Sequence, residues 1–156
     1  PSVRLAEGSR VMETGGFKGR SRAVSRTELY AGIRGTLGVP PEWVVNEYGM
    51  TELLSQFYDG VAGDPDRPGP EARVHRPPPW MRTRAVDPVT LEPMGAGEAG
   101  LLLHLDLANA GSVAAVLTED RGIVGKDGGF RILGRNPGAE PRGCSLALEE
   151  LLESRP

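Results

Sequence analysis

The chain has 156 residues, of which 25% are charged and 38% are hydrophobic, an ordinary mixture for a folded domain. Its 18 basic and 21 acidic residues leave a formal net charge of −3, without the basic excess expected of a nucleic-acid-binding protein. The 22 glycines and 14 prolines argue against a helical bundle and for short strands joined by turns. The nearly uncharged, leucine-rich stretch near residues 101–107 contains a histidine and an aspartate, so no membrane span is expected.

Cysteine usage and the first residues indicate a compartment. Cys144 is the single cysteine, which excludes an internal disulfide and fits a reducing cytosol. His75 and His104 do not stand at zinc-ligand spacing with it, so no zinc site is expected. The first four residues lack both the apolar stretch of a signal peptide and an initiator methionine. We therefore expect a cytoplasmic protein, and we expect the chain to be a piece of a longer one.

The N-terminal part is expected to alternate strand and helix. A short strand is predicted over residues 10–14. Ser25 and Glu28 have capping-box spacing, and apolar residues then recur at helical intervals until Gly38 stops the predicted helix. Residues 43–45 are a compact apolar segment that predicts a second strand.

The remainder of the chain changes from loop to β structure. Residues 63–79 contain six of the fourteen prolines and predict an exposed loop that crosses between two substructures. Strands are predicted over residues 80–86 and 101–107, and residues 126–129 are typical of a hairpin turn. We expect five or six antiparallel strands in a curved sheet or distorted barrel, and a short terminal helix over residues 146–152.

One apparent nucleotide motif is rejected. Residues 95–100 fit the G-x-G-x-x-G pattern of dinucleotide-binding proteins, and Asp120 lies twenty residues further on. That fingerprint requires a strand before the glycines and a helix after them, because the helix N-terminus holds the pyrophosphate. Here a Glu-Pro turn precedes the glycines and an alternating apolar segment follows, so a strand is predicted after them instead. His75 and His104 are interpreted as structural rather than catalytic residues.

The most informative segment is Tyr48-Gly49-Met50-Thr51-Glu52. An aromatic ring beside a glycine can lie flat against a purine base. The hydroxyl of Thr51 can donate to a phosphate oxygen, and the carboxylate of Glu52 suits Mg²⁺, which prefers a few protein oxygens together with phosphate. Five residues alone carry little weight, since an aromatic residue before glycine is more often a packing residue.

This segment resembles the Tyr-Gly-x-Thr-Glu signature of the adenylate-forming superfamily, which includes acyl-CoA synthetases, luciferases and adenylation domains. Further segments resemble that superfamily in the same order along the chain. They are Glu13-Thr14-Gly15-Gly16-Phe17, which is similar to the segment lining the adenine pocket; residues 87–93 with Gly97-Glu98-Ala99-Gly100-Leu101; and Leu117-Thr118-Glu119-Asp120 with Gly134-Arg135. The ordered matches cover about residues 10–143.

Within the superfamily the chain most resembles the acyl-protein synthetases of the bacterial bioluminescence fatty-acid reductase system. The resemblance rests on residues 15–19, 46–58 and 142–146. That family passes the acyl group to a cysteine near its C-terminus, and Cys144 stands in the matching place. The superfamily's phosphate-binding Ser/Thr/Gly loop and its C-terminal domain with a catalytic lysine are not found in the chain. We therefore expect the chain to be inactive alone. Glu119 also replaces a usual glycine, which leaves the shape of its loop open.

The resemblance implies an enzyme that activates a fatty acid with ATP and Mg²⁺, forms acyl-AMP, and acylates a thiol for reduction to an aldehyde by a partner acyl reductase. The implied residues are Tyr48, Gly49, Gly15, Gly16 and Phe17 around adenine, Thr51 on the α-phosphate, Glu52 on the metal, Asp120 on the ribose, Arg135 on the ribose–phosphate side, and Cys144 as acyl acceptor. Two alternatives stay open: a coenzyme A ligase of the phenylacetate type, with Cys144 inert, and a non-catalytic binding module.

The fold class predicted is α/β (α+β). Residues 1–63 are expected to end a nucleotide-binding α/β subdomain, and residues 64–79 to form the proline-rich crossing loop. A barrel-like β subdomain is expected over residues 80–143. Residues 144–156 are expected to hold the acceptor cysteine and the terminal helix.

Overall fold

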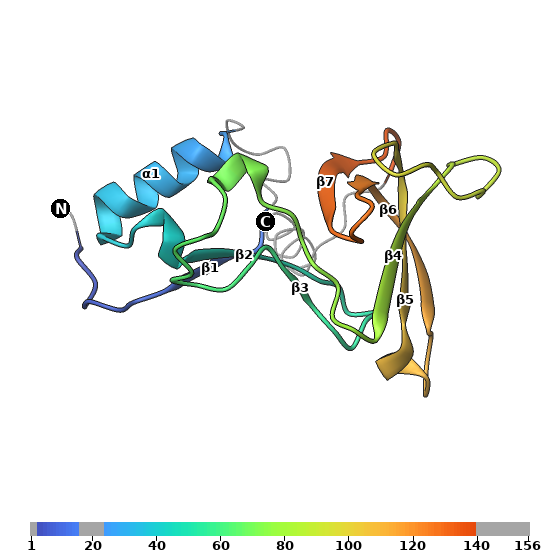
Figure 1. Cartoon of the computed structure of the whole chain (residues 1–156), viewed down its shortest axis with the longest axis horizontal. Coiled ribbons are helices and arrows are strands. Elements are labelled where there is room, and N and C mark those ends of the chain that lie inside the picture. The colour runs from blue at the N-terminus through green and yellow to red at the C-terminus, as the bar shows by residue number, and fades with distance from the viewer. Residues whose placement is uncertain (1–2, 16–23, 140–156) are drawn as a thin grey trace, which may run out of the picture.

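Two β-sheets organise this computed structural model, which describes residues 3–15 and 24–139. Figure 1 shows helix α1 and the first sheet at one end of the molecule and the second sheet at the other. The first part contains β1 (Val11–Glu13), α1 (Arg26–Leu37), β2 (Val44–Tyr48) and β3 (Phe57–Tyr58). The second contains β4 (Met81–Val86), β5 (Ala99–Asp106), β6 (Ala115–Val124) and β7 (Phe130–Arg135). The predicted mixed α/β class is confirmed.

Helix α1 begins and ends where its sequence signals predict. The Ser25 side chain accepts a hydrogen bond from the Glu28 amide, and the Glu28 carboxylate accepts one from the Ser25 amide, which completes the capping box. The helix ends at Gly38, whose φ of 76° lies in the left-handed region that glycine adopts without strain. The buried face of α1 places Tyr30 against Val39 and Val44, which fixes the helix beside β2.

The first sheet brings two chain segments to one edge. Strand β1 pairs in parallel with β2, so that Glu13 lies opposite Asn46, and the antiparallel strand β3 places Phe57 opposite Tyr48. Parallel strands end at the same edge of a sheet. The segments after Glu13 and Tyr48 therefore emerge together. Strand β2 starts one residue later than the predicted segment 43–45, because Trp43 belongs to a 3₁₀ turn. It ends three residues later, because pairing with β1 and β3 continues to Tyr48.

The second sheet is antiparallel, with the order β4-β5-β6-β7. Within residues 24–139 it has four strands rather than the five or six predicted, and it is open rather than a closed barrel. The segment 87–93 forms a turn with Leu91 at a φ of 61°, and only an isolated bridge joins Val86 to Pro93. Strand β6 is a single strand of ten residues, bent by a register shift at Arg121/Gly122.

Strand β5 buries the face that carries its polar residues. The side chains of Leu102, His104 and Asp106 are fully buried, whereas Leu107 is 70% exposed. His104 therefore does not reach solvent. Its Nδ1 instead lies 3.0 Å from the hydroxyl of Thr83. The strand predicted after the glycines of residues 95–100 is confirmed, because β5 begins at Ala99.

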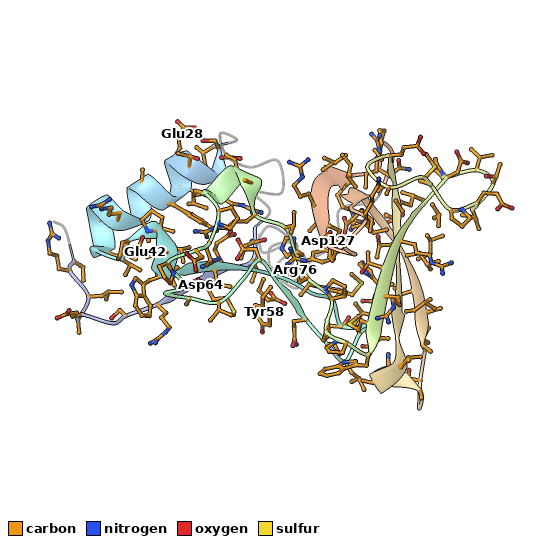
Figure 2. All side chains as sticks on the ribbon, viewed as in Figure 1. Glu28, Glu42, Tyr58, Asp64, Arg76 and Asp127 are labelled. Atoms are coloured by element: carbon orange, nitrogen blue, oxygen red, sulfur yellow. The ribbon has the colours of Figure 1, made fainter. Side chains whose placement is uncertain are left out.

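The proline-rich segment crosses between the sheets, but its predicted exposure is wrong in part. Arg73 and His75 are buried, and His75 exchanges backbone hydrogen bonds with Phe130 of β7. The Arg76 amide donates to the carbonyl of Tyr58 at the edge of β3. Figure 2 shows Arg76 beside Asp127 of the β6–β7 turn, with 2.9 Å between the charged atoms. The residues between the prolines keep their amide donors, and these tie the segment to both sheets.

Two sequence predictions fall elsewhere. The terminal helix over residues 146–152 lies outside the described residues, as does the acceptor segment around Cys144.

Of the helices within residues 3–15 and 24–139, none combines the length and apolar character needed to cross a lipid bilayer.

Candidate functional site

Three residues predicted to bind nucleotide meet where the two sheets adjoin. The hydroxyl of Tyr48, at the end of β2, donates to Oδ2 of Asp120 on β6 at 2.7 Å. Strand pairing sets Arg135 of β7 opposite Asp120, and Nη1 of Arg135 lies 3.4 Å from Oδ1 of Asp120. The same guanidinium pairs with Glu119 at 2.7 Å. Residues 72 positions apart in the chain are thus joined in one polar group, the Tyr48–Asp120–Arg135 group.

The ring of Tyr48 is half-buried in an aromatic cluster. Its centroid lies 5.8–6.0 Å from those of Phe57, His75, His104 and Phe130. Burial raises the pKa of the Tyr48 hydroxyl far above its usual value, and the hydrogen bond and charge of Asp120 raise this pKa further. The hydroxyl therefore stays protonated and remains a donor to Asp120. The adenine-stacking role of this ring stays a prediction.

Asp120 is oriented by its own strand. The Thr118 hydroxyl donates to the carbonyl of Leu102 at 2.9 Å and accepts from the Asp120 amide at 3.1 Å. The Thr118 hydroxyl thus links the backbone of Asp120 to the neighbouring strand β5, while the Asp120 side chain accepts from Tyr48. Glu119, which replaces a usual glycine of the superfamily, lies in β6 and pairs with Arg135 instead of disrupting the strand.

Thr51 and Glu52 lie on an exposed turn that directly follows Tyr48 and Gly49. The Thr51 hydroxyl donates to Oε2 of Glu52 at 3.3 Å, so the two predicted catalytic groups are neighbours. They line one side of a pocket of about 540 Å³. Its remaining lining residues are Leu54, Asn109, Ser112, Val113, Ala115, Val116 and Leu117. A Cβ on Gly49 would lie 2.6 Å from Oε1 of Glu47, the end of a flexible side chain, and 3.2 Å from Cγ of Gln56.

The predicted metal ligand stands alone as a carboxylate. In the part of the chain that the structure describes, no group of three or more His, Cys, Asp or Glu side chains could hold a metal ion together. Mg²⁺ typically takes one or two protein carboxylates and completes its shell with water and substrate phosphate. The exposed Glu52 carboxylate fits a site of that kind, in which one protein carboxylate is joined by water and phosphate.

The glycine segment after β1 reaches the same edge. Gly15 has a φ of 67°, a conformation that favours glycine, and its amide donates to the Glu13 carboxylate at 2.8 Å. A Cβ at Gly15 would lie 3.8 Å from the amide nitrogen of Asn46 on β2, so the segment passes close to the strand that ends in Tyr48. The other predicted residues of the acyl and adenine site, Gly16, Phe17 and Cys144, lie outside the described residues.

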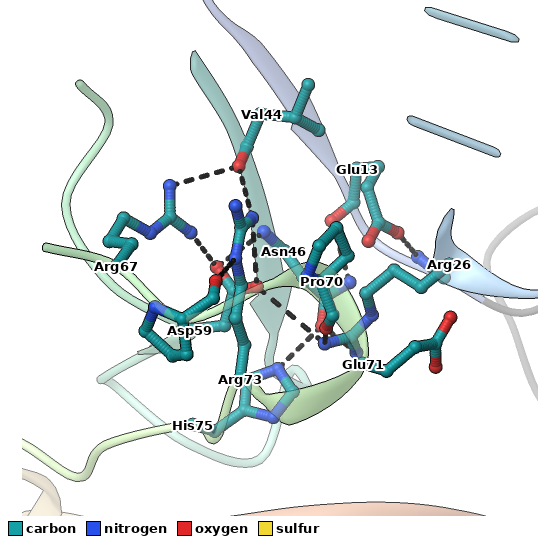
Figure 3. Close-up of polar contacts among 12 residues, drawn as sticks. Glu13, Arg26, Val44, Asn46, Asp59, Arg67, Pro70, Glu71, Arg73 and His75 are labelled. Carbon is teal, nitrogen blue, oxygen red and sulfur yellow. Dashed lines mark hydrogen bonds and ion pairs between the residues drawn. The ribbon is translucent and has the colours of Figure 1, made fainter. Parts of the chain in front are cut away.

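Behind β2 lies a buried polar network that sequence reasoning missed (Figure 3). Asp59 is fully buried, accepts from the Asn46 amide at 3.0 Å, and pairs with Arg67 at 2.7 Å. Arg73 lies 3.8 Å from the same carboxylate and donates to the carbonyl of Val44 at 3.0 Å. Both arginines donate to the Val44 carbonyl at the start of β2 and lie beside the Asp59 carboxylate, whose Oδ2 has no hydrogen-bond partner among the described residues.

Asn46 connects this network to the glycine segment. The side-chain amide of Asn46 donates to the carbonyl of Glu13 at 3.1 Å. The side-chain Oδ1 of Asn46 lies 2.6 Å from Nε2 of His75. Burial, together with the charge of Arg26, lowers the pKa of His75 from 6.5 to about 4, so this ring is neutral at pH 7. A polar residue directly after the predicted strand 43–45, two places before Tyr48, was the signal that could have identified Asn46.

Comparison with known proteins places these features in a family. A model of the family described as "Acyl-protein synthetase, LuxE" matches residues 2–153. The long-chain-fatty-acid–luciferin-component ligase of Vibrio harveyi is 31% identical over 121 residues, which are 74% of this chain and 29% of the ligase. The ligase of the same name from Aliivibrio fischeri is 47% identical over 47 residues, which are 30% of this chain and 12% of the ligase. The chain thus spans less than a third of these relatives.

Solved structures of adenylate-forming enzymes share the fold. O-succinylbenzoate coenzyme A synthetase (MenE) from Bacillus subtilis, in complex with AMP, has a TM-score of 0.58 at 20% identity, covering 99% of this chain and 33% of MenE. Apo MatB from Rhodopseudomonas palustris has a TM-score of 0.53 at 18% identity, covering 81% of this chain and 25% of MatB. These likenesses concern the fold, and the family model extends along nearly the whole sequence. This chain belongs to the acyl-protein synthetase LuxE family.

Proposed function

We propose that this chain supplies the nucleotide-binding side of an ATP-dependent fatty-acid ligase that forms an acyl-adenylate. The observation that carries the proposal is the Tyr48–Asp120–Arg135 group, because three residues that motif resemblance assigned separately to one nucleotide are joined by hydrogen bonds and charge. The names of the relatives support the substrate, since they are long-chain-fatty-acid ligases. The AMP complex of MenE and the ATP complex of MatB support a nucleotide bound by this fold.

In the proposed first step, a carboxylate oxygen of the fatty acid attacks the α-phosphorus of ATP, and the bond to pyrophosphate breaks. Catalysis of such a step consists mainly of positioning and of neutralising phosphate charge. The Thr51 hydroxyl donates to an α-phosphate oxygen, and Glu52 holds the metal. Bound Mg²⁺ supplies positive charge that offsets the charge of the phosphates. Asp120 accepts hydrogen bonds from the ribose hydroxyls while Tyr48 and Arg135 hold its carboxylate in place.

In the proposed second step, the Cys144 thiolate attacks the acyl carbonyl, AMP leaves, and a thioester forms that a partner acyl reductase reduces to the aldehyde. Arg142 precedes Cys144 by two residues, and a nearby positive charge favours the thiolate. A thiolate is a good nucleophile toward an activated acyl group. A cytoplasmic location is part of the proposal, because an acceptor thiol has to stay reduced.

The proposed division of labour follows the chain. Residues 1–63 supply the adenine side and the metal ligand, residues 64–79 cross between the sheets, residues 80–143 supply the ribose side, and residues 144–156 supply the acceptor. A second candidate function is transfer of the acyl group to coenzyme A. Its support is that a structure similar to this chain over 99% of its length is a coenzyme A synthetase.

The test uses the full-length gene product and measures fatty-acid-dependent exchange of pyrophosphate into ATP. We expect exchange by the wild type, a strong loss in Asp120→Ala, and unchanged exchange in the control Asp66→Asn, which alters an exposed aspartate of the crossing segment. Equal exchange by wild type and Asp120→Ala would refute the assignment.

The acceptor is tested with labelled fatty acid and neutral hydroxylamine, which cleaves thioesters. We expect Cys144→Ser to retain pyrophosphate exchange but to carry no hydroxylamine-labile label. A full label on Cys144→Ser would place the acceptor elsewhere. Release of acyl-coenzyme A from the wild type, without labelled protein, would favour the second candidate.

A further inference from the structure

The turn that carries Thr51 and Glu52 is held at its backbone rather than at its side chains. The Leu53 amide donates to the carbonyl of Met50 at 3.2 Å, which closes a four-residue turn with Thr51 and Glu52 at its tip. Leu53 is buried in the core between the sheets, but the two tip residues are exposed. Within the turn, the Thr51 hydroxyl donates to the Glu52 carboxylate, but both side chains are exposed, so the position of the turn depends on contacts with the rest of the molecule.

Asn109, which follows β5 of the second sheet, anchors the backbone of this turn at one point. It lies in the 3₁₀ helix Leu107–Asn109 that follows β5, and its side chain is 5% exposed. Its amide donates to the backbone carbonyl of Glu52 at 2.8 Å and to that of Val113 at 3.0 Å. A planar amide with both donor hydrogens in use has one orientation. The carbonyl of Glu52 is therefore fixed relative to the second sheet.

Asp106 fixes the second anchor. It is fully buried, and its Oδ2 accepts from the Leu54 amide at 3.1 Å. Its Oδ1 accepts from the Ala108 amide at 3.0 Å, at the start of the helix that carries Asn109. A carboxylate that only capped this helix would need no partner 52 residues away. A fully buried charge is retained at a high desolvation penalty, which these amide donors offset.

We propose that Asp106 and Asn109 are positioning residues, which fix the turn so that Thr51 and Glu52 face the phosphates and the metal. The inference rests on the proposed function of Glu52. One residue holds the carbonyl of Glu52, and the other holds the amide two residues further on. The pair thus sets the position of the backbone that carries Glu52. Both belong to the end of β5 and its following helix, so the second sheet contributes to the metal side of the site as well as to the ribose side.

A double-mutant cycle tests the action of Asn109 through Glu52. In the full-length gene product, Asn109→Ala should lower fatty-acid-dependent turnover by about 10- to 100-fold, the range found when a partner of a metal ligand is removed. In a Glu52→Gln background the same change should lower turnover less than about twofold, because the carboxylate that it positions is already gone. A merely structural role predicts the same factor in both backgrounds, and that result would overturn the proposal. The apparent Mg²⁺ affinity should fall in Asn109→Ala and be unchanged in the control Asp66→Asn.

Hydrogen exchange tests Asp106 without any activity measurement. Asp106→Asn preserves size but replaces one acceptor oxygen with a donor, so we expect faster exchange of the Leu54 or Ala108 amide and unchanged exchange in the core strand β5. If the variant does not fold, Asp106→Ser supplies a shorter acceptor for the same measurement. Unchanged exchange at both amides would contradict the positioning role. A wild type that shows no fatty-acid-dependent exchange of pyrophosphate into ATP would instead refute the proposed function. The amide hydrogen-exchange rates would still decide whether Asp106 holds the turn.

Discussion

The buried network behind β2 and the turn that follows β2 use charged residues in opposite ways. Behind the strand, Asp59, Arg67 and Arg73 are buried and paired with one another or with backbone carbonyls. On the turn that continues from the strand, Thr51 and Glu52 are exposed, and their anchors are backbone groups. Each charge of the buried network faces an opposite charge, so the network belongs to the fold, although Oδ2 of Asp59 and Nε of Arg67 have no hydrogen-bond partner among the described residues. The carboxylate of Glu52 remains accessible to a ligand, which is what a metal-binding residue requires.

The largest effect is expected from breaking the buried network. Asp59→Ala leaves Arg67 and Arg73 as buried charges without their carboxylate, and removal of one partner of a buried pair costs about 3–5 kcal/mol. Chemical denaturation should show this loss in the free energy of unfolding. Asp66→Asn is the matched control and should be near neutral. A stability close to wild type in Asp59→Ala would remove the structural half of the comparison.

Glu52→Gln should do the reverse. It should lower turnover about 100-fold, the scale of removing one group that stabilises developing charge, while ATP affinity and the free energy of unfolding change little. Calorimetry with ATP and the pyrophosphate-exchange rate measure the two quantities. A variant that loses stability but retains turnover would show that Glu52 belongs with the structural charges.

Tyr48→Phe sharpens the comparison because Tyr48 ends strand β2 directly before the turn. The ring and its packing remain, and only the hydrogen bond to Asp120 is lost. Hydrogen bonds to charged groups contribute about 1.5–3 kcal/mol, so ATP affinity should fall roughly tenfold or more. Tyr48→Ala, which also removes the ring, should weaken binding further if the ring stacks on adenine. Equal affinity for ATP in wild type and both variants would contradict the assigned nucleotide site.

A smaller effect is expected from pH. Burial lowers the pKa of both His75 and His104 from 6.5 to about 4, so the unfolded chain binds more protons than the folded chain between these values. The stability from the neutral rings is fully present above pH 6.5 and is lost as pH falls toward 4. At pH 5.5 the loss should be about 1 kcal/mol per histidine. The free energy of unfolding of a His75→Gln/His104→Gln variant, taken from denaturation curves at several pH values, should change less with pH over this range. An unchanged dependence on pH would argue against the buried neutral rings.

Local signals in the sequence predicted most of the elements. The capping box of Ser25 and Glu28, the stop at Gly38 and the hairpin turn at residues 126–129 depend on neighbours within a few positions, so each was readable and is confirmed. Among the described residues the second sheet has four strands, fewer than predicted, because residues 115–124 form one continuous strand and the segment 87–93 is a turn. The proline count predicted an exposed crossing but gave no sign that Arg73 would be buried.

The site divides in the same way. Tyr48, Asp120 and Arg135 were found because each belongs to a recognisable segment, although only the fold shows that they bond to one another. Asp106 and Asn109 escaped sequence reasoning because their partners lie more than 50 positions away. Such long-range bonds depend on how β5 pairs and where its last residue falls relative to the turn, which local patterns do not determine.

The most direct test of the central claim is calorimetric titration of the full-length gene product with a hydrolysis-resistant analogue of a long-chain acyl-adenylate. The account predicts tight binding by the wild type, and binding weaker by about tenfold or more in Asp120→Asn, since the ribose contact and its hydrogen bonds with Tyr48 and Arg135 are altered together. Asp66→Asn should bind like the wild type. Equal affinity in Asp120→Asn and wild type would contradict the claim that these strands form the nucleotide side of an adenylating site.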